Sequence, residues 1–191
     1  MPTPRALLAA VTLALAGVAS AALQPPADAS PPVTASNWRG HPKITVIRNL
    51  VKGNQLAMAT KRWRPEAARR CRNEARPFAA ETIAVRDEQR RIRTYVTSEA
   101  WNDSAYRIEH HYDEAGRLRF ALARSSAVNG AFVEYRLFLD ERGKELWRDV
   151  RARGSYGFQR PPAFPDDALV RDPVVAAAIP LRCDASTAPG H

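Results

Sequence analysis

Asp113-Glu114-Ala115-Gly116-Arg117 is the stretch that decides the fold, and related copies stand at residues 87–91 and 140–144. Asp, polar residues, Gly and a cation are typical of a type I turn that ends in a left-handed bulge residue. Each copy lies between two runs rich in β-branched and aromatic residues, so each predicts the tip of a β-hairpin. In the first copy Arg90 stands where the others have Gly, and a left-handed Arg costs about 1 kcal/mol unless the turn is of another type.

The middle copy predicts the best-defined hairpin, with one apolar face and one polar face. A turn at residues 113–117 sets the cross-strand partners on the apolar face. The expected pairs are Tyr112 with Leu118, His110 with Phe120, and Ile108 with Leu122. The polar face would then be the one exposed to water.

The third hairpin differs, because its first strand, residues 132–139, is apolar on both faces. The same turn geometry places Leu137 opposite Trp147, and Phe138 opposite Leu146 on the other side. A strand of this kind is usually covered twice. We expect the N-terminal helix on one side of it and the C-terminal tail on the other.

One motif resembles a known family. The segment from Tyr112 to Leu118, YDEAGRL, is similar to the unit of the tyrosine-aspartate repeats of large bacterial secreted shell proteins. The likeness covers these seven residues once, and the period here is longer. It supports a hairpin and implies no activity.

The segments outside the hairpins predict short helices and irregular chain. Apolar spacing from Pro42 to Thr60 predicts an amphipathic helix, with Gly53 as a candidate break and a short strand at 44–47 as the alternative. Residues 65–73 and 172–178 predict further short helices, and five prolines between residues 161 and 180 exclude long regular structure. The fold class is α+β: a six-stranded antiparallel meander of three hairpins curled against an N-terminal helix, with a Pro-rich C-terminal tail.

The ends of the chain predict export. Residues 1–21 have the charged start, apolar stretch and small-residue cleavage site of a signal peptide, with an uncleaved membrane anchor as the alternative. A Pro/Ala-rich disordered spacer at 22–40, a single domain at 41–185 and a flexible tail at 186–191 would follow. The destination would be periplasmic or extracellular, and in such a compartment Cys71 and Cys183 are expected to form a disulfide bond.

The chain is basic, with a formal charge of +9 that Arg mostly carries. The densest stretch, Lys61 to Arg76, predicts a surface for anionic partners such as acidic lipids, polysaccharide or nucleic acid. The partner would be an anionic envelope component or another exported protein. A solvated face of an Arg-rich chain is the plainer interpretation. The residues expected to bind anions are Lys61, Arg62, Arg64, Arg69, Arg70 and Arg72.

The apolar face of the sheet is a second candidate, either as a filled core or as a ligand pocket. Its expected lining residues are Tyr106, His110, Phe120 and Tyr135. No catalytic residue, metal or cofactor is predicted, since His110 and His111 point to opposite faces of a strand and no known catalytic motif occurs.

The sequence therefore favours an exported, non-catalytic binding or interaction module. One alternative is a polyanion or envelope-surface binder that uses the basic stretch. The other is a small secreted hydrolase, which would require a cleft where at least two of Glu109, His110, His111, Glu134 and Asp149 converge.

Overall fold

The computed structural model describes residues 30–73, 78–154, 164 and 166–181. The predicted signal peptide, residues 22–29 of the predicted spacer, Cys183 and residues 186–191 lie outside them. The Cys71–Cys183 disulfide therefore stays a prediction. Trp38 falls inside the predicted spacer, yet its side chain is buried against Phe138 and Trp147. The ordered domain thus begins before residue 41.

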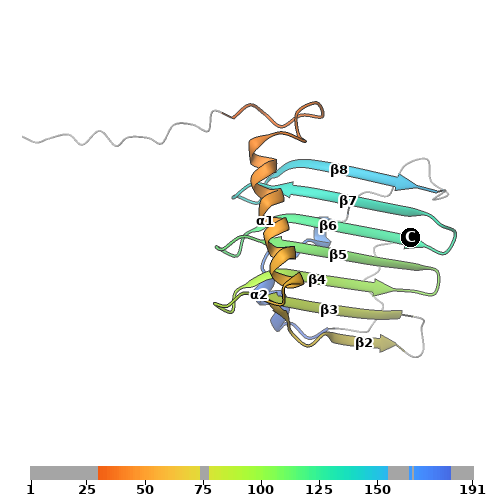
Figure 1. Ribbon diagram of the computed structural model, residues 1–191. Helices are drawn as coiled ribbons and strands as arrows, with labels where there is room; N and C mark the ends of the chain where they lie inside the picture. Colours follow the sequence, from red (N-terminus) through yellow and green to blue (C-terminus); the bar gives the residue numbers. More distant parts are fainter. Residues whose placement is uncertain (1–29, 74–77, 155–163, 165, 182–191) are drawn as a thin grey trace, which may run out of the picture. The chain divides into compact units, whose positions relative to one another are not determined.

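The fold is an antiparallel sheet with a helix across one face (Figure 1). The chain forms α1 (Pro42–Ala59), β1 (Arg64–Pro65), β2 (Arg69–Asn73), β3 (Phe78–Arg86), β4 (Ile92–Ala100), β5 (Ser104–Tyr112), β6 (Leu118–Ala127), β7 (Phe132–Leu139), β8 (Glu145–Arg153), a 3₁₀ turn (Asp166–Ala168) and α2 (Pro173–Ala178). Strands β3 to β8 are neighbours in chain order, as a meander requires. The α+β class and the three hairpins are confirmed.

The predicted count of six strands is wrong, because residues 65–73 form no helix. β1 and β2 instead pair with β3 at different places along its outer edge, which makes eight strands in one sheet. The helix signal was Pro65 followed by Glu66, whereas the pairing of Arg69 to Asn73 with β3 depends on tertiary contacts. By contrast, α1 is continuous through Gly53, and α2 begins after Asp172, whose side chain caps it.

The three hairpin turns share one geometry. In each, the Oδ1 atom of the leading Asp accepts the backbone N–H groups two and four positions further on, at 2.8–3.0 Å. The residue at the fourth position has a positive φ: 66° at Arg90, 76° at Gly116 and 76° at Gly143. Arg90 therefore adopts the left-handed conformation rather than a different turn. The Asp carboxylate thus supplies an acceptor for backbone N–H groups that the turn itself would leave without a partner.

The predicted register is wrong beyond the first pair, because the structure has a β-bulge beside each turn. Tyr112 does pair with Leu118, but His111 pairs with Phe120 and His110 with Ala121, so Arg119 is an extra residue in β6. Arg93 and Leu146 occupy the same place in the other hairpins. Phe120 consequently lies on the opposite face from His110, and Phe138 pairs with Trp147. A one-residue slip moves each later side chain to the other face.

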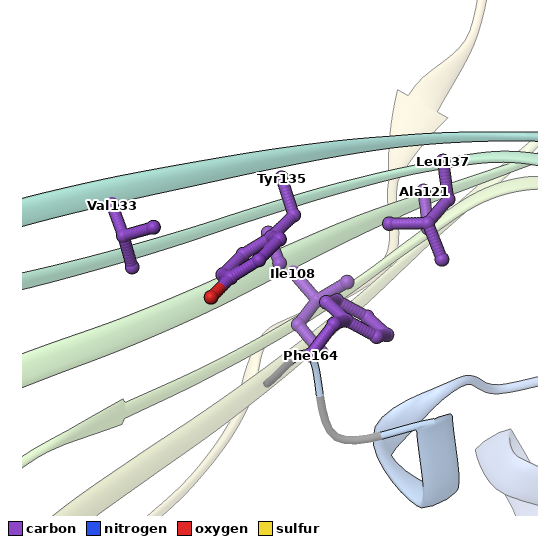
Figure 2. Packing of buried hydrophobic residues seen from close by; sticks show 7 residues of the cluster. Ile108, Ala121, Val133, Tyr135, Leu137 and Phe164 are labelled. Carbon is purple, nitrogen blue, oxygen red and sulfur yellow. The ribbon is translucent and has the colours of Figure 1, made fainter. Parts of the chain in front are cut away.

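The sheet carries a core on each face. On the α1 face, Ile44 and Ile47 pack against Phe120, Leu122 and Phe138. On the other face, Phe164 packs against a cluster of Ile108, Ala121, Val133, Tyr135 and Leu137 (Figure 2). β7 is packed on both sides near the third turn, at Leu137 and Phe138. Further along, its α1 face carries Glu134 and Arg136, so the predicted double cover holds for only part of the strand.

Two side chains of β5 hold the C-terminal segment on that second face. The backbone N–H of Val170 donates to His110 Nε2 at 3.2 Å, and the Tyr112 hydroxyl donates to the Val170 carbonyl oxygen at 2.7 Å. Since Nε2 accepts, Nδ1 carries the proton and donates to the Tyr95 carbonyl oxygen at 3.1 Å. His110 is therefore a buried neutral imidazole, and its burial lowers its pKa to about 4.

Tyr112→Phe should lower the free energy of unfolding by about 1 kcal/mol, because it removes one buried hydrogen bond and leaves the ring in place. Urea unfolding measures this, and hydrogen exchange at the Val170 amide should quicken as well. An unchanged hydrogen-exchange rate at the Val170 amide would contradict the role of these hydrogen bonds in holding the C-terminal segment.

Candidate functional site

The face of the sheet that α1 crosses is only half covered by the described residues. α1 lies over the strand ends next to the three hairpin turns, and the other half of each strand extends beyond it (Figure 1). We call this second half the arginine face. Its charged residues are Arg70, Arg72, Glu81, Arg107, Glu109, Arg124, Glu134, Arg136, Asp149, Arg151 and Arg153.

The strand pairing arranges this face in rows that run across the strands. Each member of a row pairs with the next, from β2 to β8. The middle row is Arg70, Glu81, Ser98, Arg107, Arg124, Glu134 and Arg151. The outer row is Arg72, Ala79, Ala100, Ala105, Ser126, Phe132 and Arg153. With neighbouring strands about 4.8 Å apart, each row spans about 29 Å.

An open hollow of about 700 Å³ lies where these rows cross β2 to β5. Eight of its twelve lining residues belong to the arginine face: Arg70, Arg72, Ala79, Glu81, Ser98, Ala100, Ala105 and Arg107. Three of the eight are alanines and one is a serine, so the floor is low while the arginines stand higher around it. The hollow exists because small residues lie between long ones.

Carboxylates hold the arginines in place without neutralising all of them. Arg70 contacts Glu81 at 2.6 Å, Arg107 contacts Glu109 at 3.2 Å, and Arg151 contacts Asp149 at 3.3 Å. The seven arginines of the face stand beside four carboxylates, which leaves an excess of three positive charges. A guanidinium has five N–H donors, so an arginine already bound to one carboxylate can still donate to a second anion.

Glu134 is the most buried acid of the face. Burial alone would raise its pKa, but the hydrogen bond from Arg124 and the charge of Arg136 outweigh burial and lower the pKa. Both arginines contact it, at 2.9 and 2.7 Å. Glu134 is therefore a fixed carboxylate that orients two arginines.

The described residues of the predicted basic stretch, 61–73, do not form one surface. Arg62 pairs with Glu88, and Arg69 donates to the carbonyl oxygens of Ala176 and Ile179 on the opposite face of the sheet. Lys61 follows the end of α1, and Arg64 lies in β1. Of the six residues named in the sequence analysis, the structure places Arg70 and Arg72 on the arginine face.

The predicted apolar pocket residues are also separated. Tyr106, His110 and Tyr135 lie on the face that the C-terminal segment covers, whereas Phe120 lies under α1. The Tyr135 ring meets Phe164 edge-on at 5.6 Å. The space beside these three residues therefore holds core side chains of the protein itself.

Of the acids and histidines considered for catalysis, Glu109, His111, Glu134 and Asp149 share the α1 face, and His110 lies on the other face. Glu109 and Glu134 are held by arginines. Within residues 30–73, 78–154, 164 and 166–181, no three His, Cys, Asp or Glu residues gather as a metal site would require. No helix in the same part of the chain is long and apolar enough to cross a bilayer.

Sequence reasoning missed Arg107, Arg124, Arg136, Arg151 and Arg153 as one group. They lie far apart in the chain, and only correct strand pairing brings them together. A signal did exist: charged residues of either sign recur at every second position in β5, β7 and β8, as expected for one face of a strand.

No protein-family model, curated protein or solved structure matches this chain.

Proposed function

We propose that the protein is an exported, non-catalytic binding module that holds an anionic ligand on its arginine face. The observation that carries this proposal is the excess of seven arginines over four carboxylates on a half-face that no described helix covers. The signal-like residues 1–21 support export. The ligand would meet the protein outside the cytoplasm.

The geometry suits carboxylate, sulfate or phosphate groups. Arg70, Arg72 and Arg107 surround a hollow whose floor is formed by small side chains, so an anionic group can approach all three. Guanidinium groups bind oxyanions with two parallel hydrogen bonds, and they lose little water in doing so. Arg70 and Arg107 are already oriented by Glu81 and Glu109, which lowers the entropy lost on binding.

Heparin is a suitable first probe, and the test compares two double variants. Arg70→Gln/Arg107→Gln removes two charges from the hollow and should weaken heparin binding at least about tenfold, or about 1.4 kcal/mol, in 150 mM salt. Arg142→Gln/Lys144→Gln removes two charges from the third hairpin turn, at the other end of the strands. It should change the affinity less than about twofold, since those side chains are screened from the hollow.

Titration calorimetry at two salt concentrations measures both effects. If the turn variant loses as much affinity as the hollow variant, binding depends on total charge and the site proposal is wrong. Thermal unfolding of both variants checks that the fold is kept.

A further inference from the structure

We propose that the ligand of the arginine face is an extended acidic polysaccharide that lies across the strands from β2 to β8. This inference rests on the proposed function and adds the ligand's class, length and direction. Two features carry it: the position of the arginines at both edges of the sheet, and the small residues between them.

The positive charges are spread along a line rather than gathered at a point. In the middle row, arginines occur on β2, β5, β6 and β8, and the outer row has one at each end, Arg72 and Arg153. The strand spacing puts the two ends about 29 Å apart. A small anion can contact only one end, whereas a chain with repeated anionic groups can contact both.

The outer row provides a path for such a chain. Between Arg72 and Arg153 it contains Ala79, Ala100, Ala105, Ser126 and Phe132. The hollow covers the part of the outer row on β2 to β5. The arginines of the middle row lie beside the outer row on β2, β5, β6 and β8. A polymer in this trough would have its anionic groups beside the arginines.

The aromatic content of the face favours a polysaccharide over a nucleic acid. Proteins that bind single strands without sequence preference stack bases on aromatic side chains. Phe132 is the one aromatic residue among the fourteen described residues of the middle and outer rows, and the Arg153 guanidinium already lies over its ring, 5.1 Å from the centroid. An acidic polysaccharide needs the charges and the trough but no stacking.

The test uses two heparin fragments and two double variants. One fragment is a disaccharide, and the other is long enough to span the sheet. Arg70→Gln/Arg72→Gln alters the β2 end and should weaken both fragments. Arg151→Gln/Arg153→Gln alters the β8 end and should weaken the long fragment about tenfold, while leaving the disaccharide within twofold.

Each other outcome overturns a definite part of the account. If the β8 variant leaves the long fragment unaffected while the β2 variant weakens both, the site is local and the polymer inference fails, but the proposed function stands. If neither fragment binds the unaltered protein, the proposed function fails with it. If an oligothymidylate of equal charge binds more tightly than the long fragment, the ligand class is wrong.

A second measurement covers the case in which a variant does not fold. Amide and arginine Nε–H NMR signals of the unaltered protein are followed as the long fragment is added. Shifts on both β2 and β8 support a ligand across the sheet, and shifts on β2 alone contradict it.

Discussion

Asp87→Ala should lower the free energy of unfolding by about 3–5 kcal/mol, the range for breaking a buried ion pair by removing one partner. Asp87 has a side chain only 1% exposed, and its Oδ2 atom contacts the buried Arg93 at 3.3 Å. Its Oδ1 atom also holds the turn in which Arg90 is left-handed. The substitution would leave Arg93 buried without its carboxylate and the turn without its support.

Asp140→Ala is the matched control that the repeat supplies. Asp140 makes the same two backbone hydrogen bonds in its turn, but Leu146 occupies the place of the buried arginine. We expect a loss of about 1 kcal/mol there, as for other side chains that cap backbone N–H groups. The loss of stability for Asp113→Ala should lie between those of the other two variants. Arg119, the buried arginine beside Asp113, would keep a second carboxylate, because it also contacts Glu141 at 2.6 Å.

Urea unfolding of the three variants measures this series. Equal losses at Asp87 and Asp140 would show that the turns alone matter and that the buried arginines add nothing.

The second large effect is a loss of stability on mild acidification. Burial lowers the pKa of both His110 and His111 to about 4 in the folded protein, against 6.5 in a freely exposed imidazole. Below pH 6.5 these two histidines therefore bind protons in the unfolded chain but stay neutral in the folded protein. The free energy of unfolding consequently falls as the pH falls, down to about pH 4. Because a tenfold difference in proton affinity corresponds to about 1.36 kcal/mol, each histidine should contribute a loss of about 2 kcal/mol between pH 7 and pH 5.

His111 is the sharper test of the two. Its ring is fully buried on the α1 face beside Phe120, and neither ring nitrogen has a hydrogen-bond partner among the described residues. In the same part of the structure Thr94, its cross-strand partner, likewise has a buried hydroxyl without a partner. His111→Leu should thus keep or raise the stability at pH 7 and remove about half of the loss between pH 7 and pH 5, since it deletes one of two titrating groups.

Unfolding free energies at several pH values measure the slope. The carboxylates Asp87, Asp113 and Glu134 have lowered pKa values, so their protonation destabilises the fold only below the histidine range. An unchanged slope in the His111→Leu variant would contradict the burial of a neutral imidazole.

The hairpins could be predicted from the sequence because turn chemistry is local. Asp113, Gly116 and the flanking β-branched runs determine a turn without help from distant residues, and the same holds for Asp140 and Gly143. α1 was also predictable, since Pro42 and the spacing of Ile44 and Ile47 act within one element.

The register was predictable only at its first pair. The bulge residues Arg93, Arg119 and Leu146 shift the strands by one position, and a bulge depends on the contacts of its extra side chain. Arg93 donates to the Tyr112 carbonyl oxygen and Arg119 to that of Leu139, so each buried arginine joins one hairpin to the next. Such contacts between hairpins are invisible in a local pattern.

The arginine face could not be predicted for the same reason. A run of cations such as Lys61 to Arg76 is conspicuous in a sequence, yet alternation within β2 sends Arg69 to one face and Arg70 to the other. The arginines that do share a face come from five strands. Their grouping is a consequence of sheet order and could not be found before the pairing was known.

The central claim is that an anionic ligand binds on the arginine face. Arginine Nε–H NMR signals of the ¹⁵N-labelled protein, recorded as heparin oligosaccharide is added, test it most directly. The account predicts saturable shifts at Arg70, Arg72, Arg107 and Arg124, with Arg91 and Arg117 at the hairpin turns unaffected. Shifts of equal size at the turn arginines, or shifts that never saturate, would contradict it.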